Sequence, residues 1–368
     1  MIYTVKLQAD SSAQFVDIFG STKELILLNP KVTSELNSAG SFDFVMPPSH
    51  TYYNLPKILL SNVEVYEENQ LIFFGRVSEI EVDFYKQKTV HCEGALAFFN
   101  DTIQRPAEWD VISIRNFLTY IVTAHNANAA SDRQFTIGTI SENLGNKGVY
   151  RKLDYETTFE VFKRMIVNAE GGYLFVRRTN GVTYLDYLEE LPTTGDQPIQ
   201  YAVNLMDLKQ TYGINELYTS VIPLGAEDEN TGEKLTIASV NSGSDRLDAS
   251  SDVMAAFGRI EHVEEFSDID DPTKLKTEGQ AWLARQDFNS FSIEVDAAEL
   301  HYINQLYSAW KLGQRIRILS TPHLIDTTLH LTKVTYKLDK GAKQITVGTK
   351  KKQTLTEIYN GKTEEYVK

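Results

Sequence analysis

Apolar and polar residues alternate along much of the first hundred residues, a pattern typical of β-strands that bury one face. Glu68 and Asn69 interrupt the alternation, while Pro47, Pro48 and Pro56 disfavour a regular strand in the connection before it. We therefore expect antiparallel β-structure in this part of the chain, with strands over residues 63–66, 71–77, 80–84 and 89–92.

A helical period replaces the alternation in the next hundred residues. Ser113 is a candidate N-cap for a helix whose inward face consists of Ile114, Phe117, Leu118, Ile121 and Val122. A second helix is predicted over residues 158–169, with a threonine at 157 or 158 as its cap and Gly171-Gly172 as its stop.

Asn180-Gly181 stands between two strand-like runs, at residues 173–176 and 182–185. Both positions of a type I′ turn need a positive φ, which asparagine and glycine tolerate, so this dipeptide predicts a hairpin. Together with the two helices, the hairpin makes residues 98–195 a small α/β module.

The second half of the chain is strand-like again from residue 204 through residues 217–224, and an acidic, polar stretch at residues 227–251 follows. Asp271-Pro272 has the form of an N-cap followed by proline at the first helical position. The helix that it opens is expected to face inward with Leu275, Gly279, Trp282 and Leu283. Further strands are predicted over residues 217–224, 291–295, 315–319, 329–338 and 344–347, and the lysine-rich residues after 350 are expected to fray.

A faint internal repeat links the two β-rich parts. The run marked by Val63, Val77, Val90 and Gly94 recurs as Ile316, Val334, Ile345 and Gly348. The intervals differ by a few residues and few identities align, so the pattern alone leaves duplication and two unrelated β-meanders both open.

Composition and charge exclude several classes of protein. The 368 residues suffice for two to four domains, and the net charge of −14 disfavours a protein that grips nucleic acid through a basic face. Cys92 is the only cysteine, which excludes an internal disulfide and a thiolate metal cluster. We expect neither a secretory signal nor a membrane span, because the apolar stretches are only a few residues long.

The residue types that carry chemistry form no recognisable catalytic or metal-binding motif. The lone Cys92 is predicted to be a small buried hydrophobe, and each histidine a structural or surface residue: His50, His91, His125, His262, His301, His323 and His330. The adjacent acids Glu67-Glu68, Glu189-Glu190 and Glu264-Glu265 are predicted to be solvated charges in turns or at strand ends. Residues 268–272 begin like a calcium loop but fit helix capping better. No catalytic, cofactor-binding or metal-binding residue is therefore predicted, and no cofactor.

Two stretches resemble the tail-hub proteins of siphophages and prophages, a family also described as prophage tail endopeptidases or the N-terminal part of tail-associated lysins. The first runs from Gly40 through Pro47, Ile72–Val77 and Val90–Gly94 to Asp101. The second comprises Leu312–Ile318, Ser320–Asp326 and Leu331–Leu338. The stretches between them also resemble this family, so the resemblance covers most of the chain.

The resemblance implies a mainly β fold with α+β modules. It implies two tail-tube-like β-barrels, a small α/β domain and a helical insertion, as in the hub subunit of contractile-phage baseplates. The expected domains are residues 1–97, 98–195, 196–350 with an insertion at about 226–290, and a tail or linker at 351–368.

The function that the resemblance implies is structural. A homotrimer would form a pseudo-sixfold ring that joins the hexameric tail tube and distal tail proteins to a threefold spike, fibre or lysin, and would let genomic DNA pass without specific binding. The chain would be made in the host cytoplasm and reside at the virion tail tip. An acidic lumen would repel phosphates.

Two alternatives stay open. Family members named for endopeptidase or lysin activity carry it in a further C-terminal domain, so we expect this chain not to be an enzyme. A cell-wall-degrading enzyme would instead clear a peptidoglycan suspension, and a receptor- or glycan-binding tail-tip module would bind cell walls in a pull-down.

Overall fold

The computed structural model describes residues 2–189, 195–212, 218–228, 231–267, 269–284, 291–304 and 306–348. The chain divides into two compact units, which are described separately. One comprises Met1–Gln210 with Ser292–Lys368, and the other comprises Thr211–Phe291.

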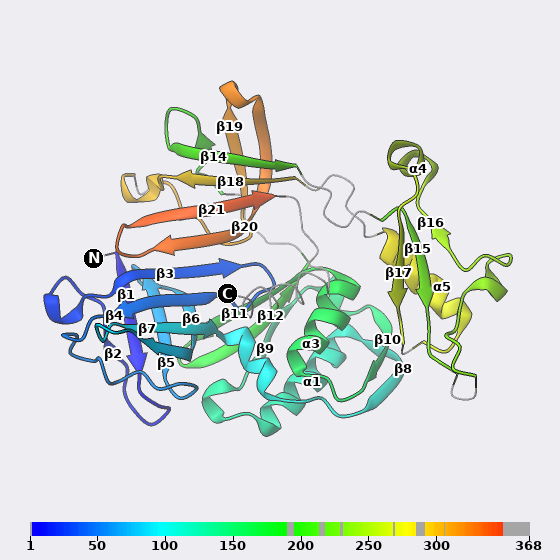
Figure 1. Cartoon of the computed structure of the whole chain (residues 1–368), viewed down its shortest axis with the longest axis horizontal. Coiled ribbons are helices and arrows are strands. Elements are labelled where there is room, and N and C mark those ends of the chain that lie inside the picture. Colours follow the sequence, from blue (N-terminus) through cyan, green and yellow to red (C-terminus); the bar gives the residue numbers. More distant parts are fainter. Residues whose placement is uncertain are drawn as a thin grey trace. The chain divides into compact units, whose positions relative to one another are not determined.

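A strongly curled, 13-stranded sheet forms the body of the first unit (Figure 1). Along its main path the strands follow the order β14-β18-β21-β20-β3-β4-β7-β6-β5-β1-β2, and β19, which pairs with β13, is attached to β20. Their bounds are β1 Tyr3–Gln8, β2 Val16–Asp17, β3 Leu28–Glu35, β4 Ser41–Met46, β5 Asn62–Glu67, β6 Gln70–Val82, β7 Lys88–Gly94, β13 Ile199–Gln200, β14 Leu205–Tyr212, β18 Phe291–Ala297, β19 Arg315–Ser320, β20 Ile325–Lys337 and β21 Ala342–Gly348.

The two runs that suggested a sequence repeat have the same strand layout. The neighbours β3-β4-β7-β6-β5 of the first run correspond to β14-β18-β21-β20-β19 of the second. The central strands β6 and β20 are both 13 residues long, and each has a bulge, between Val77 and Glu79 and between Leu331 and Lys333. The two layouts join where β3 pairs antiparallel with β20.

The α/β module of the first unit confirms the predicted caps and turn. Helix α1 (Ile114–Asn128) begins after Ser113, whose side chain accepts a hydrogen bond from the Asn116 N–H. A capping box opens α3 (Thr158–Val161), and both Asn180 and Gly181 have positive φ between β11 (Tyr173–Thr179) and β12 (Val182–Leu188). The remaining elements are β8 Ala107–Ser113, β9 Thr136–Ile140, α2 Glu142–Gly145 and β10 Gly148–Leu153.

Two details of this unit differ from the prediction. The second helix continues as a π-helix over Phe162–Asn168, where Arg151 donates a 2.8 Å hydrogen bond to the Met165 carbonyl. The strand predicted over 80–84 ends at Val82, because Asp83 accepts a hydrogen bond from the Gln87 N–H and closes a turn. Phe84 lies in that turn and is 93% exposed.

The second unit is a three-stranded sheet against which one helix, α5, packs with Leu275 and Leu283. Its strands lie in the order β16 (Leu247–Asp248), β15 (Ser220–Leu224) and β17 (Glu261–Glu265), and its helices are α4 (Ser251–Phe257) and α5 (Pro272–Ala284). Asp271 accepts hydrogen bonds from the N–H groups of Thr273 and Lys274, so the predicted N-cap is confirmed. In the chain this unit is inserted between β14 and β18. The corresponding strands of the first repeat, β3 and β4, are joined only by a short turn.

The predicted fold class, mainly β with α+β modules, is confirmed by this architecture. No helix of the described residues is long and apolar enough to cross a membrane.

Candidate functional site

The most extensive candidate site is one face of the central sheet, over the seven adjacent strands from β18 to β6 (Figure 1). Burial alternates along most of these strands, and β6 adds an outward side after its bulge, so every second side chain enters the core and the others face outward. We call the outward side the polar face. It consists of Lys31, Thr33, Glu35, Ser41, Asp43, Val45, Glu79, Glu81, Thr89, His91, Glu93, Glu294, Asp296, Lys333, Thr335, Lys337, Gln344 and Thr346.

The polar face is acidic, because it holds seven carboxylates and three lysines, and only one further cation, Arg76, pairs with it from β6, at 2.6 Å from Glu93, among the described residues. Lys333 lies 3.5 Å from Glu35, and His91 Nδ1 lies 2.8 Å from Asp43. Both pairs are partly exposed, so water screens them and they contribute little to stability. What the face offers chemically is therefore a repulsive surface for polyanions rather than a binding pocket.

A buried polar junction lies on the opposite, core side of the same sheet. Lys343 of β21 is fully buried, and its Nζ lies 2.7 Å from Glu67 Oε1 and 2.5 Å from Glu299 Oε2. Glu67 is the last residue of β5, so this ion pair joins the two repeats. The prediction that the acid at 67 is a solvated turn charge is wrong, because Glu67 is buried against Lys343.

Two tyrosines complete the buried junction. The hydroxyl groups of Tyr3 and Tyr302 both donate to Glu67 Oε1. Burial and the negative charge of Glu67 raise the pKa of Tyr3, while burial and its hydrogen bond to Glu67 raise the pKa of Tyr302. Both side chains therefore remain neutral donors throughout the physiological pH range, and the junction holds its charges in one fixed arrangement.

The histidines lie at separate places in the structure. His91 is on the polar face, and His262 contacts the rings of both Tyr218 and Trp282, which also lie 6.0 Å from each other, in the second unit. The other five contact a backbone carbonyl or a hydroxyl group: His50 at Ile18, His125 at Thr102 and Arg133, His301 at Tyr307, His323 at Ser320 and His330 at Gly313. Within the described ranges, no three His, Cys, Asp or Glu residues are grouped so that they could hold a metal ion.

The remaining candidates from the sequence are equally dispersed. Cys92 is buried in β7, and burial raises the pKa of its thiol. Glu265 is paired with Lys234 at 2.6 Å on β17, and Glu189 accepts a hydrogen bond from Asn143. Glu190 and Asp268 lie outside the described residues.

The pH dependence of stability tests whether the His125 ring is buried in its neutral form. Burial lowers the pKa of its ring, so the folded state prefers the neutral form. The stability that the buried, neutral His125 ring contributes is fully present above the unfolded pKa of about 6.5, and it is lost as pH falls through the folded pKa. The unfolding free energy of the wild type should therefore fall between pH 7 and pH 5. We expect His125→Gln to reduce the slope of this fall by up to about 1.4 kcal/mol per pH unit.

Urea unfolding at several pH values measures that slope. His323→Gln, in an exposed turn, is the matched control and should keep the slope of the wild type. Identical slopes for His125→Gln and the wild type would contradict the assignment of a buried, neutral ring.

Comparison with known proteins agrees with the fold. Residues 192–358, somewhat less than half of the chain, match the family model described as prophage endopeptidase tail. No functionally curated protein matches the sequence.

Three solved structures superpose on nearly the whole chain. The 43 kDa tail protein of prophage MuSo2 from Shewanella oneidensis has a TM-score of 0.64 at 12% identity, covering 95% of this chain and 98% of its own. The tail protein from Neisseria meningitidis MC58 has a TM-score of 0.62 at 14% identity, covering 95% and 97%. Prophage tail protein gp18 from Listeria monocytogenes EGD-e has a TM-score of 0.58 at 12% identity, covering 98% of both chains.

These matches confirm the resemblance to prophage tail proteins that the two sequence stretches indicated. The chain is therefore similar in fold to prophage tail proteins over nearly its whole length, and its residues 192–358 match the prophage endopeptidase tail family model.

Proposed function

We propose that this chain is a structural, non-catalytic hub subunit of a phage tail tip. Three copies form a ring in which each contributes two β-barrel-like repeats, within residues 1–97 and 196–350, with the module at 98–195 and the insertion at about 226–290 outside the ring. The ring joins the tail tube and distal tail proteins to a threefold spike, fibre or lysin, and the subunit is made in the host cytoplasm before it enters the virion.

One observation carries this proposal: two equivalent strand layouts lie in one continuous sheet. A chain with two such repeats supplies six equivalent modules in a trimer, which fits a sixfold partner above and a threefold partner below. The match to the prophage tail fold supports the same role.

The charge of the polar face supports a passage for DNA. The carboxylates of this face outnumber its cations even when the Arg76–Glu93 pair is included, so the face repels phosphates and nucleic acid would slide past without being held. A strongly basic lumen in the assembled ring would contradict this part of the proposal.

The oligomeric mass of the purified chain tests the ring. We expect light scattering at high protein concentration to give three times 41.7 kDa, about 125 kDa, and negative-stain images to show a central hole. A stable dimer would contradict the threefold ring, because a two-subunit assembly cannot present three equivalent positions to the spike.

A further inference from the structure

Three aromatic side chains of the second unit lie together on the side of its sheet where α5 packs. Tyr218 stands just before β15, His262 lies on β17, which pairs with β15, and Trp282 lies on α5 (Figure 1). The ring centroids are 4.3 Å apart for Tyr218 and His262, 5.1 Å for His262 and Trp282, and 6.0 Å for Tyr218 and Trp282. Each ring therefore contacts both of the others, and we call this group the aromatic cluster.

The planes of the three rings are close to parallel. His262 and Trp282 differ by 6°, and Tyr218 differs from them by 28° and 31°. His262 cannot lie between the other two, because two stacking distances of roughly 3.5 Å would separate those rings by about 7 Å. Tyr218 and Trp282 therefore lie side by side, and His262 stacks against one side of the pair. The aromatic cluster offers flat ring faces and does not form a cage.

The aromatic cluster is fixed on one side and partly open on the other. Trp282 packs against the core that contains Leu275 and Leu283, which holds the orientation of its ring. Tyr218 and Trp282 are nevertheless only half-buried, and the side chain of His262 is 29% exposed. Strand β17 is also an edge strand, which pairs only with β15 among the described strands.

Two carboxylates lie next to the aromatic cluster. Glu264 follows His262 by two residues on the same side of β17, and its Oε2 lies 3.1 Å from the His262 Nε2. Glu278 stands one turn before Trp282 on α5 and is half-buried, and side chains four residues apart are neighbours on a helix. Carboxylate oxygens accept strong hydrogen bonds from hydroxyl groups. The cluster is therefore bordered by acceptors for a ligand rich in hydroxyl groups.

The charge of the second unit excludes anionic ligands from this surface. Its sequence, Thr211–Phe291, contains sixteen acidic and six basic residues, which is a net charge of −10 out of −14 for the whole chain. Such a unit repels polymers that carry phosphate or carboxylate groups. A quaternary ammonium ligand would be attracted, but aromatic sites for such cations enclose the cation in a cage of ring faces, which near-parallel rings do not provide.

We propose that the aromatic cluster is a binding site for an uncharged pyranose saccharide. One face of a pyranose ring consists of C–H groups with a slight positive charge, and these pack on the negative face of an aromatic ring. The hydroxyl groups around the same sugar ring then donate to Glu264 and Glu278. Saccharide binding adds a second activity to the structural role proposed above, and it does not depend on how copies of the chain assemble.

An array of immobilised oligosaccharides tests the ligand class with the full chain. The array holds uncharged pyranose oligosaccharides, with and without N-acetyl groups, beside saccharides that carry phosphate or uronic acid groups. We expect binding to one or more of the uncharged saccharides and none to the anionic ones. Absence of binding to every uncharged saccharide would overturn the proposal, and so would a preference for the anionic ones.

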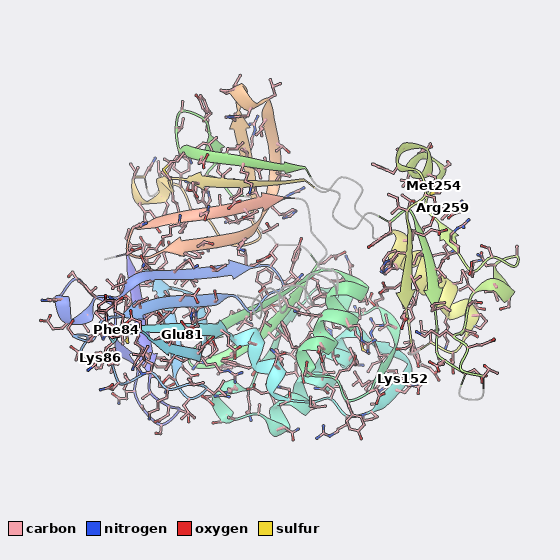
Figure 2. All side chains as sticks on the ribbon, viewed as in Figure 1. Glu81, Phe84, Lys86, Lys152, Met254 and Arg259 are labelled. Atoms are coloured by element: carbon pink, nitrogen blue, oxygen red, sulfur yellow. The ribbon has the colours of Figure 1, made fainter. Side chains whose placement is uncertain are left out.

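Titration calorimetry with the bound saccharide tests the position of the site. We expect Trp282→Ala to weaken binding by about tenfold, whereas Trp282→Phe, which keeps an aromatic ring, should stay within about threefold of the wild type. Phe84→Ala is the matched control and should bind like the wild type. Phe84 is 93% exposed in the first unit, and Figure 2 shows it near Glu81 and Lys86. Equal affinities of Trp282→Ala and the wild type would contradict a site at the aromatic cluster.

Two further measurements decide the outcome even if Trp282→Ala does not fold. Glu264→Gln keeps the size of the side chain but replaces a charged acceptor by a neutral one, so binding should weaken by roughly fivefold with an unchanged circular dichroism spectrum. Saturating saccharide should also change the tryptophan fluorescence of the wild type but not that of Trp282→Phe, which retains Trp109 and Trp310. The same fluorescence change in both proteins, or full affinity of Glu264→Gln, would overturn the assignment of the site.

Discussion

Replacing Lys343 by methionine should destabilise the first unit by about 3–5 kcal/mol. The substitution keeps most of the side-chain volume but removes the only positive charge that contacts both Glu67 and Glu299 among the described residues. Two buried carboxylates then face each other without a counter-charge, which costs far more than the ion pair itself contributes. Urea unfolding followed by tryptophan fluorescence measures the loss.

Lys333→Met is the matched control for this prediction. Lys333 lies on neighbouring strand β20 and is also paired with a glutamate, but both partners are about 40% exposed. Such surface pairs are worth roughly 0–1 kcal/mol, so this variant should unfold almost like the wild type. Adding Glu67→Gln and Glu299→Gln to Lys343→Met should recover part of the stability. A Lys343→Met protein as stable as Lys333→Met would show that the buried junction does not hold the repeats together.

Reversing the charge of the polar face should convert it into a surface that holds DNA. Glu35→Lys, Asp43→Lys and Glu294→Lys replace three outward carboxylates on β3, β4 and β18. The wild type should not bind a short DNA duplex at about 50 mM salt, whereas the triple variant should bind it. Its affinity should fall between about 50 and 200 mM salt with a logarithmic slope of roughly −0.9 for each phosphate contacted. Fluorescence anisotropy measures both quantities.

The control moves the same charge change to the second unit. Asp245→Lys, Asp252→Lys and Asp270→Lys replace exposed carboxylates there and give the same net charge. Equal binding by both triple variants would mean that net charge alone, and not the polar face, keeps the protein from DNA. Failure of the polar-face variant to bind would contradict the idea that acidity of this face protects a DNA passage.

The sequence predicted the local features of the fold well because their causes lie within a few residues. Ser113 and Asp271 cap helices whose N–H groups lie two or three residues later, and Asn180-Gly181 sets its own turn. The faint sequence repeat also corresponds to a repeat in the structure, since its matching residues lie on β5, β6 and β7 in the first run and on β19, β20 and β21 in the second. The spacing of apolar residues is enough for this, because one face of every strand must enter the core.

The sequence failed where the cause lies far away in the chain. Glu67 stands beside Glu68 at a turn and looks solvated, but its partner Lys343 follows 276 residues later. The residues around Glu67 in the sequence give no indication of its contact with Lys343. The polar face was missed for the same reason: its charges come from seven strands, each of which contributes two or three residues that look like ordinary solvent-facing positions.

The second unit enters the chain between two neighbouring strands, where the first repeat has only the turn between Glu35 and Ser41. Its entry and exit strands, β14 and β18, are hydrogen-bonded to each other, so they lie about one strand spacing, roughly 5 Å, apart. A domain attached through such closely spaced ends can be exchanged without altering the register of the sheet. The junction of β14 and β18 is therefore a suitable insertion site. Related proteins can carry different domains there, and a tag or a foreign domain can be inserted there by experiment.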